Sequence, residues 1–213
     1  MATSAKTQRY REPRWPALIA IFADALIHFA LPDRLSVGPH WFLFAVILVL
    51  LIPIVFSHQT GRYNLARVLT FIAIAALTLA LISSLALLIS GLPSHKDPPR
   101  TLLLSATLLW VTNVLVFALW YWKLDAGGPI GRERPGAKSS FLFPQMMQPY
   151  RDTDPSWSPV FFDYLFLAFN TSTAFSPTDT AVLSRWAKGL MMLQSILSLS
   201  IIAILAARAI NIL

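Results

Sequence analysis

The chain has 213 residues, of which 56% are hydrophobic and only 13% charged, and its formal net charge is +7. Soluble domains carry about a quarter charged residues, so this composition argues against a soluble domain and indicates one integral membrane bundle. The sequence contains no cysteine, which excludes disulfides, a thiolate nucleophile and a cysteine-type zinc site.

The basic residues lie at the ends of apolar segments, a placement typical of lipid headgroup contact rather than nucleic-acid binding. Residues 1–14 form a basic tail with the charge order of a signal peptide. The apolar stretch after it contains Asp24 and His28, and no small-residue cleavage site follows cleanly. We therefore expect a retained first helix and a multi-pass protein of the cell (inner) membrane, with the lipid bilayer and no nucleic acid as partner.

Residues 15–122 predict a four-helix transmembrane region, because about 20 apolar residues span a bilayer as a helix. The first expected helix is short and carries Asp24 and His28, whereas the third is the longest uninterrupted apolar run. Turns rich in proline, glycine and charge separate the helices. The expected helices are Trp15–Leu31, Trp41–Phe56, Val68–Leu92 and Thr101–Trp122.

Residues 123–157 are expected to form an extramembrane or interfacial loop. The opening segment, KLDAGGPIGRERPGAK, is too rich in glycine, proline and charge to predict a regular element. The segment after it, FLFPQMMQPYRDTDPSW, is aromatic and proline-rich and is expected at the membrane surface. This loop separates the four-helix region from residues 158–213.

Residues 158–213 combine a short helix, a polar loop and a long helix. Ser158 and Pro159 predict a helix start, with a capping hydroxyl followed by proline at the first helical position. The apolar run that follows has roughly ten residues, about 15 Å of helix, which is too short to cross a bilayer. A polar segment with a proline comes next, and a final helix from about Ser184 to Leu213 is long enough to span. Irregular backbone at membrane depth requires surrounding protein or water, so the pattern predicts a re-entrant pore loop.

The expected fold is therefore all-α, with five transmembrane helices plus a re-entrant pore helix. The C-terminal segment, DYLFLAFNTSTAFSPTDTAVLSRWAKGLMMLQSILSLSIIAILAARAINIL, resembles the pore helix, filter and inner helix of potassium channels. The resemblance covers residues 163–213, and the four preceding helices look like those of a group of uncharacterised bacterial membrane proteins. It implies a homo-tetramer that conducts monovalent cations. The matching positions are Asp163, Phe169, Thr171, Thr173, Asp179, Ser184, Ala187, Lys188, Leu193, Ala207 and Arg208.

The filter departs from the family pattern. Where potassium channels have Thr-Val-Gly-Tyr-Gly, this chain has Ala174, Phe175, Ser176, Pro177 and Thr178. Glycines supply the left-handed dihedrals that aim filter carbonyls at the ion, and serine and threonine adopt these dihedrals only at a cost. Pro177 fixes φ and lacks an N–H, and Ala174 removes a threonine ligand. We therefore expect a cation channel with weak or altered potassium selectivity.

Several polar side chains remain beside this loop as candidate pore-loop groups: Thr171, Ser172, Thr173, Ser176, Thr178 and Asp179. In a tetramer one Asp179 per chain forms a carboxylate ring that attracts cations, whereas in a simple turn it caps backbone amides. A ring of Phe175 would instead close the pore, which favours a non-conducting scaffold or accessory subunit. On the final helix Gln194, Ser198 and Leu205 are pore-lining candidates, although polar residues there serve helix packing equally well.

Asp24 and His28 lie four residues apart, on one face of the first helix. An ionisable residue at membrane depth indicates function, so a proton-coupled carrier is a further hypothesis. Two alternatives remain open: the helix is partly interfacial, or the two side chains pair with each other or with a neighbouring helix.

No enzyme activity, cofactor or metal is expected. The sequence shows no nucleophile elbow and no phosphate-binding glycine loop. The histidines are scattered without metal-ligand spacing. They are His28, His40, His58 and His95.

The 17 lysines and arginines give a topology prediction. With five spans only Arg34, Lys96, Arg100 and Arg208 lie opposite the N-terminus, which leaves thirteen on its side. The positive-inside rule then makes the N-terminus cytoplasmic, and the pore loop enters from the cytoplasm, inverted relative to potassium channels. If the first helix does not cross, the parity changes and the orientation of potassium channels returns.

Overall fold

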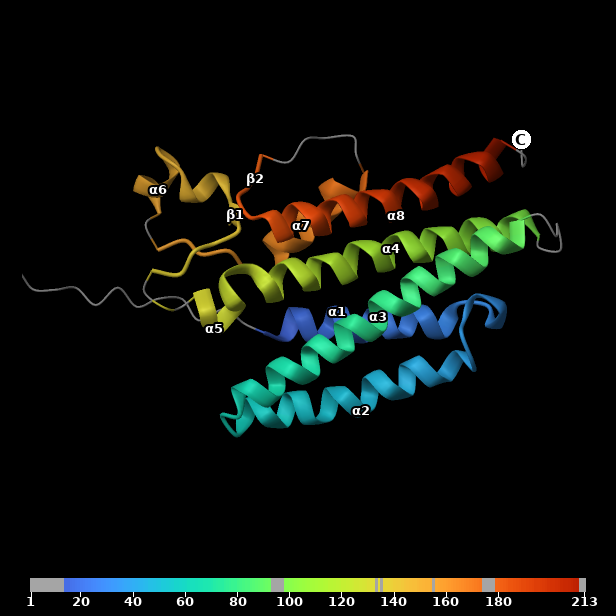
Figure 1. Cartoon of the computed structure of the whole chain (residues 1–213), viewed down its shortest axis with the longest axis horizontal. Coiled ribbons are helices and arrows are strands. Elements are labelled where there is room, and N and C mark those ends of the chain that lie inside the picture. Colours follow the sequence, from blue (N-terminus) through green and yellow to red (C-terminus); the bar gives the residue numbers. More distant parts are fainter. Residues whose placement is uncertain are drawn as a thin grey trace, which may run out of the picture.

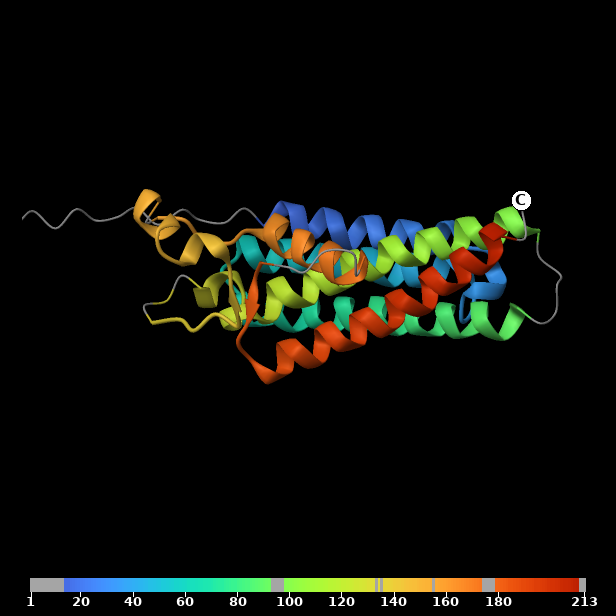
Figure 2. The ribbon, with the colours of Figure 1, turned by 90° about the horizontal axis from the view of Figure 1, so that it is seen from above.

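The computed structural model describes residues 14–92, 98–132, 134, 136–154, 156–173 and 179–210. The long helices lie side by side along the long axis of the molecule, and the short elements α5, α6, β1 and β2 gather at one end (Figures 1 and 2). The elements are α1 (Trp15–Ala30), α2 (His40–Gln59), α3 (Tyr63–Gly91), α4 (Pro99–Leu124), α5 (Pro129–Arg132), β1 (Phe141–Leu142), α6 (Tyr150–Thr153), α7 (Phe161–Thr173), β2 (Ala181–Val182) and α8 (Arg185–Ile210). Short 3₁₀ turns occupy Asp33–Leu35, Asp125–Gly127 and Pro144–Met146.

Four helices of the described chain, α2, α3, α4 and α8, are long and apolar enough to cross a membrane. The helical membrane class expected from the sequence is confirmed at this level, with the two-residue β1–β2 pair as an addition. Helix α1 is apolar but has 16 residues, about 24 Å at 1.5 Å per residue, against a hydrocarbon core of about 30 Å. A fifth crossing by α1 stays a prediction.

The helices extend beyond the apolar runs that predicted them. Helix α2 ends at Gln59 rather than Phe56, and α3 begins at Tyr63 rather than Val68. Polar residues continue a helix as readily as apolar ones once a turn has formed, so an apolar run sets only the minimum length. Helix α7 begins at Phe161 rather than at Ser158–Pro159.

The start of α7 differs from the predicted hydroxyl cap. The backbone N–H of Val160 donates to Asp163 Oδ2 at 2.8 Å. A carboxylate in the first turn therefore binds a backbone donor just before the helix. This arrangement also places negative charge at the positive end of the helix dipole.

Helix α4 is the central helix of the bundle. It packs against α1, α3, α7 and α8, and 61% of the stretch Arg100–Arg132 is buried, compared with 17% of His40–Ser57 in α2. Buried small residues, including Ser105, Ala106 and Ala118, let neighbouring helices approach closely in lipid. Trp120 Nε1 donates to Thr78 Oγ1 at 2.9 Å and ties α4 to α3.

The segment after α4 is more ordered than its composition predicted. The glycine-rich stretch contains the single helical turn α5, which corrects the expectation of no regular element. Gly131 is required there, because a Cβ at this position would lie 2.1 Å from the carbonyl oxygen of Ala126. Phe141 and Phe143 are buried in the core against Tyr164, with centroid distances of 6.1 and 5.4 Å. The expected position of this segment at the membrane surface stays a prediction.

The β1–β2 pair returns the chain after α7 to the end where α7 begins (Figure 1). Phe141 pairs with Val182, and Leu142 pairs with Ala181. Leu183 N also donates to the carbonyl oxygen of Ser140 at 2.8 Å. Because α7 has 13 residues, about 20 Å, it ends part-way along the 26-residue α8.

Candidate functional site

Asp125 holds the start of α7 against the end of α4. This carboxylate is fully buried and accepts hydrogen bonds from Tyr164 Oη (2.6 Å), Ser139 Oγ (2.7 Å) and the backbone N–H of Ser140 (2.5 Å). Arg132 covers the other side of Tyr164, with its guanidinium carbon 5.0 Å from the ring centroid. The sequence did not indicate the role of Asp125, because the donors to its carboxylate lie 14, 15 and 39 residues away along the chain.

The far end of α7 is bound by hydroxyls of α8. The last four carbonyls of a helix have no partner within it. Ser198 Oγ donates to the Ser172 carbonyl at 2.5 Å, and the two serine hydroxyls lie 2.7 Å apart. Ser195 Oγ lies 3.5 Å from the Thr171 carbonyl. These contacts provide partners for two of the four carbonyls, at the point where the predicted pore loop begins.

Gln194 connects α7, α8 and α4. Its Nε2 donates to the Ala168 carbonyl at 2.8 Å, and its Oε1 accepts from Tyr121 Oη at 2.5 Å. The backbone carbonyl of Gln194 accepts from Asn113 Nδ2 at 3.3 Å. All of these polar groups are buried, so their hydrogen bonds fix the relative positions of three helices in a region without competing water.

The predicted pore loop lies only partly within the described residues. Ala174, Phe175, Ser176, Pro177 and Thr178 are outside them. The threonine hydroxyls before this segment bond to their own helix, Thr171 to the Leu167 carbonyl (2.8 Å) and Thr173 to the Asn170 carbonyl (3.2 Å). Asp179, directly after the segment, is exposed.

The three pore-lining candidates of the final helix have different surroundings. Gln194 and Ser198 are buried against α7, and their polar atoms are bonded within one chain, as helix packing requires. Leu205 is half-buried near the far end of α8. A pore-lining role for the three residues stays a prediction about the assembled protein.

Asp24 is fully buried where α1 meets α4. Neither carboxyl oxygen has a hydrogen-bond partner among the described residues, and the Thr112 hydroxyl that it faces also has none. His28 Nδ1 lies 3.2 Å from the Asp24 backbone carbonyl, and His28 Nε2 has no described partner. The two side chains therefore do not pair with each other, which excludes one of the alternatives that the sequence left open.

A cavity of about 370 Å³ lies beside His28, between the end of α1, the start of α2 and the middle of α3. Its polar lining includes His40, Ser83 and Ser84. The His40 ring is held by Asp33, with 2.6 Å between Nδ1 and Oδ1. A partly polar cavity thus reaches one of the two ionisable residues of α1.

Two regions of the described chain therefore combine polar side chains with burial inside the helical bundle: the contact of α7 with α8, and the α1 carboxyl. No group of three or more histidine or acidic side chains there is placed to hold a metal ion. Comparison with protein-family models, curated proteins and solved structures finds no match to this chain.

Proposed function

We propose that this protein is a cation-permeable channel in which four copies assemble with α7 as a re-entrant pore helix. The supporting observation is the half-length α7, which ends beside the middle of α8 and is followed by a return to its starting end. A helix that ends inside the bundle exposes carbonyls that need partners, and Ser195 and Ser198 of α8 provide them. These bonds hold the α7 end at a fixed depth, as a pore helix requires.

The carboxylate of Asp179 is the proposed cation-attracting group. It is exposed and follows the loop directly, so four copies around an axis form a ring of negative charge. The C-terminal ends of four α7 helices, which lie further inside the bundle, add negative potential. Selectivity for potassium is expected to be weak, because the loop contains no glycine.

Planar-bilayer recording of the purified protein tests this proposal. The native chain should carry cation current, and Asp179→Asn should lower its single-channel conductance. The reduction should be larger in 0.1 M than in 1 M potassium chloride, because the Debye length falls from about 10 Å to about 3 Å.

The matched control is Asp152→Asn, which removes another exposed carboxylate of the short-element end. Its conductance should equal that of the native chain. A persistent lack of current from the native protein across voltage and pH would contradict the channel and favour the non-conducting scaffold or accessory subunit.

A proton-coupled carrier is a second candidate, because both oxygens of the fully buried Asp24 lack a described partner. Membrane proteins keep such groups where protons or ions bind. Proteoliposome uptake driven by a pH gradient should then be lost in Asp24→Asn and retained in Asp33→Asn, whose carboxylate is largely exposed. Single-channel events that persist in Asp24→Asn would argue against the carrier.

A further inference from the structure

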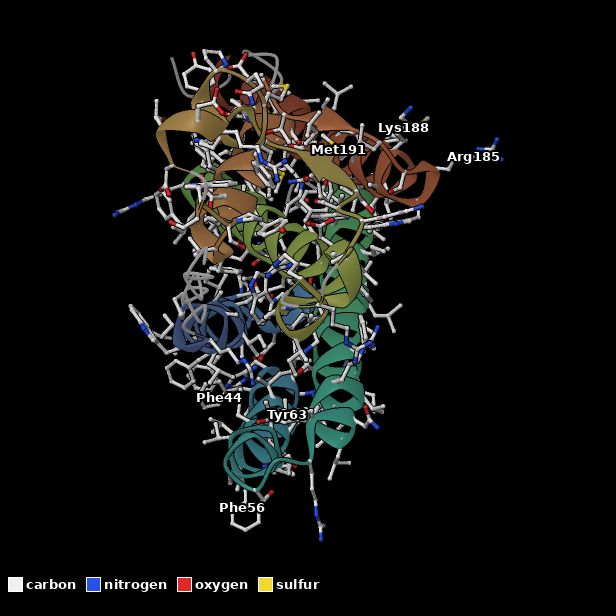
Figure 3. All side chains as sticks on the ribbon, turned by 90° about the vertical axis from the view of Figure 1, so that its left-hand side faces the viewer. Phe44, Phe56, Tyr63, Arg185, Lys188 and Met191 are labelled. Atoms are coloured by element: carbon white, nitrogen blue, oxygen red, sulfur yellow. The ribbon has the colours of Figure 1, made fainter. Side chains whose placement is uncertain are left out.

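A large cleft with a basic lining opens at the end of the bundle that carries the short elements. Its volume is about 890 Å³, within the roughly 300–1,000 Å³ of small-ligand sites. The turn before α3, the end of α4 and the loop around α5 form its walls, and Figure 3 looks at this end, with Tyr63 of the lining labelled. Four cationic side chains line it: Arg62, Arg67, Lys123 and Arg134.

Lys123 is the most unusual of these cations because its side chain is only 7% exposed. Its Nζ lies 6.0 Å from the Phe71 ring centroid and 5.7 Å from that of Trp122. The guanidinium of Arg67 lies 5.7 Å from the same Phe71 ring. Two cations from different helices therefore share one aromatic ring at the wall of the cleft.

The described lining residues include no aspartate or glutamate, and Glu133 of the same loop lies outside the described residues. The ion pair between His40 and Asp33 lies at the start of α2, away from the cleft. Burial disfavours the charged ammonium of Lys123, and the neighbouring guanidinium groups add repulsion. An anion bound in the cleft removes both penalties.

The loop at the wall of the cleft packs closely against the backbone of Lys123. Gly128 has a φ of +85°, and a Cβ there would lie 3.0 Å from the Lys123 carbonyl oxygen. The chain at α5 thus comes directly against the residue that carries the buried ammonium. The backbone of the α4–α5 connection therefore forms this wall of the cleft.

We propose that this cleft binds the phosphate group of an anionic ligand at the membrane interface. Arginine forks match phosphate oxygens in geometry, and a lysine ammonium adds a concentrated charge, which is the usual donor set for phosphate. Two sources supply such a group: the headgroup of an acidic phospholipid and a soluble phosphate compound. The proposal does not depend on ion conduction.

Thermal unfolding of the full chain tests the proposal with two probes. One arm compares nanodiscs of phosphatidylglycerol with nanodiscs of phosphatidylcholine, and the other adds inorganic pyrophosphate at constant ionic strength. The variants are Arg62→Gln with Arg67→Gln, which changes exposed residues, and Lys123→Met. The matched control is Arg185→Gln with Lys188→Gln, which removes two cations of α8 that extend away from the bundle at the same end (Figure 3).

We expect at least one probe to stabilise the native chain. In the arginine double variant, the concentration of that probe that gives half of the maximal stabilisation should be about tenfold higher. The control should keep native binding, and Lys123→Met should weaken binding wherever it folds. Stabilisation by phosphatidylglycerol alone identifies a lipid headgroup, and stabilisation by pyrophosphate alone identifies a soluble ligand. Equal loss in the cleft and control variants, or no stabilisation by either probe, overturns the proposal.

Discussion

Gln194 shows how one buried amide can determine the position of three helices. Its side-chain Nε2 donates to the Ala168 carbonyl and its Oε1 accepts from the Tyr121 hydroxyl. Its backbone carbonyl accepts a hydrogen bond from Asn113 Nδ2. The sequence marked Gln194 and Ser198 as a polar pair on one helix face, and both do face α7. The sequence did not indicate their hydrogen-bond partners, because these lie on helices far away along the chain.

We predict that Gln194→Leu destabilises the protein by about 1–3 kcal/mol, because it leaves a buried carbonyl and a buried hydroxyl without partners. The measurement is the free energy of unfolding in detergent micelles, followed by circular dichroism.

The control is Ser200→Ala on the same helix, whose exposed hydroxyl bonds only to the Ile196 carbonyl of its own helix. It should stay within about 0.5 kcal/mol of the native value. Equal losses in the two variants would show that the Gln194 bonds contribute nothing specific.

At the scale of elements, α7 is the helix whose length decides its role. Its 13 residues end beside Ser198 of α8, well short of the opposite end of the bundle. The sequence predicted this half-length element from a short apolar run followed by polar residues. It did not predict the start, where Asp163 rather than Ser158 binds the free backbone donor.

Because the natural chain contains no cysteine, the α7–α8 contact can be tested by a disulfide. The hydroxyls of Ser172 and Ser198 lie 2.7 Å apart, so Ser172→Cys with Ser198→Cys should form an intramolecular disulfide under mild oxidation. Intact-mass measurement should show the loss of about two mass units expected from two thiol hydrogens.

The control pairs Ser172→Cys with Ser200→Cys, whose side chain is exposed rather than directed at Ser172. It should remain a dithiol. A disulfide in the control, or none in the first pair, would mean that α7 does not occupy this position on α8.

At the scale of the whole molecule, charge separates the two ends. The turn before α3, the end of α4 and the start of α8 bring cations to the α5 end, whereas Arg34 and Arg100 lie at the other. Helices α1, α3 and α8 start at the α5 end and α2 and α4 finish there, so the arrangement matches the five-span charge count (Figure 1). If α1 crosses as predicted, the positive-inside rule predicts that the α5 end is cytoplasmic.

We predict that alkaline phosphatase fused after Leu213 is active outside the cytoplasm and that a fluorescent protein fused there is dark. The reason is that α8 carries the chain to the end opposite the cation-rich one. A fluorescent protein at the N-terminus is the control and should be bright. A reporter after Leu213 that works only in the cytoplasm would contradict the inverted pore loop.

The sequence alone determined the helical membrane class, the places of the long helices and the half-length α7. These properties depend on local composition and on the fixed rise of a helix, which a single segment contains. Only the tertiary structure decided which buried polar groups meet. Asp125 and Tyr164 are 39 residues apart, and Asn113 and Gln194 are 81 apart. The basic cleft likewise draws its cations from three segments, and no local pattern records which segments pack together.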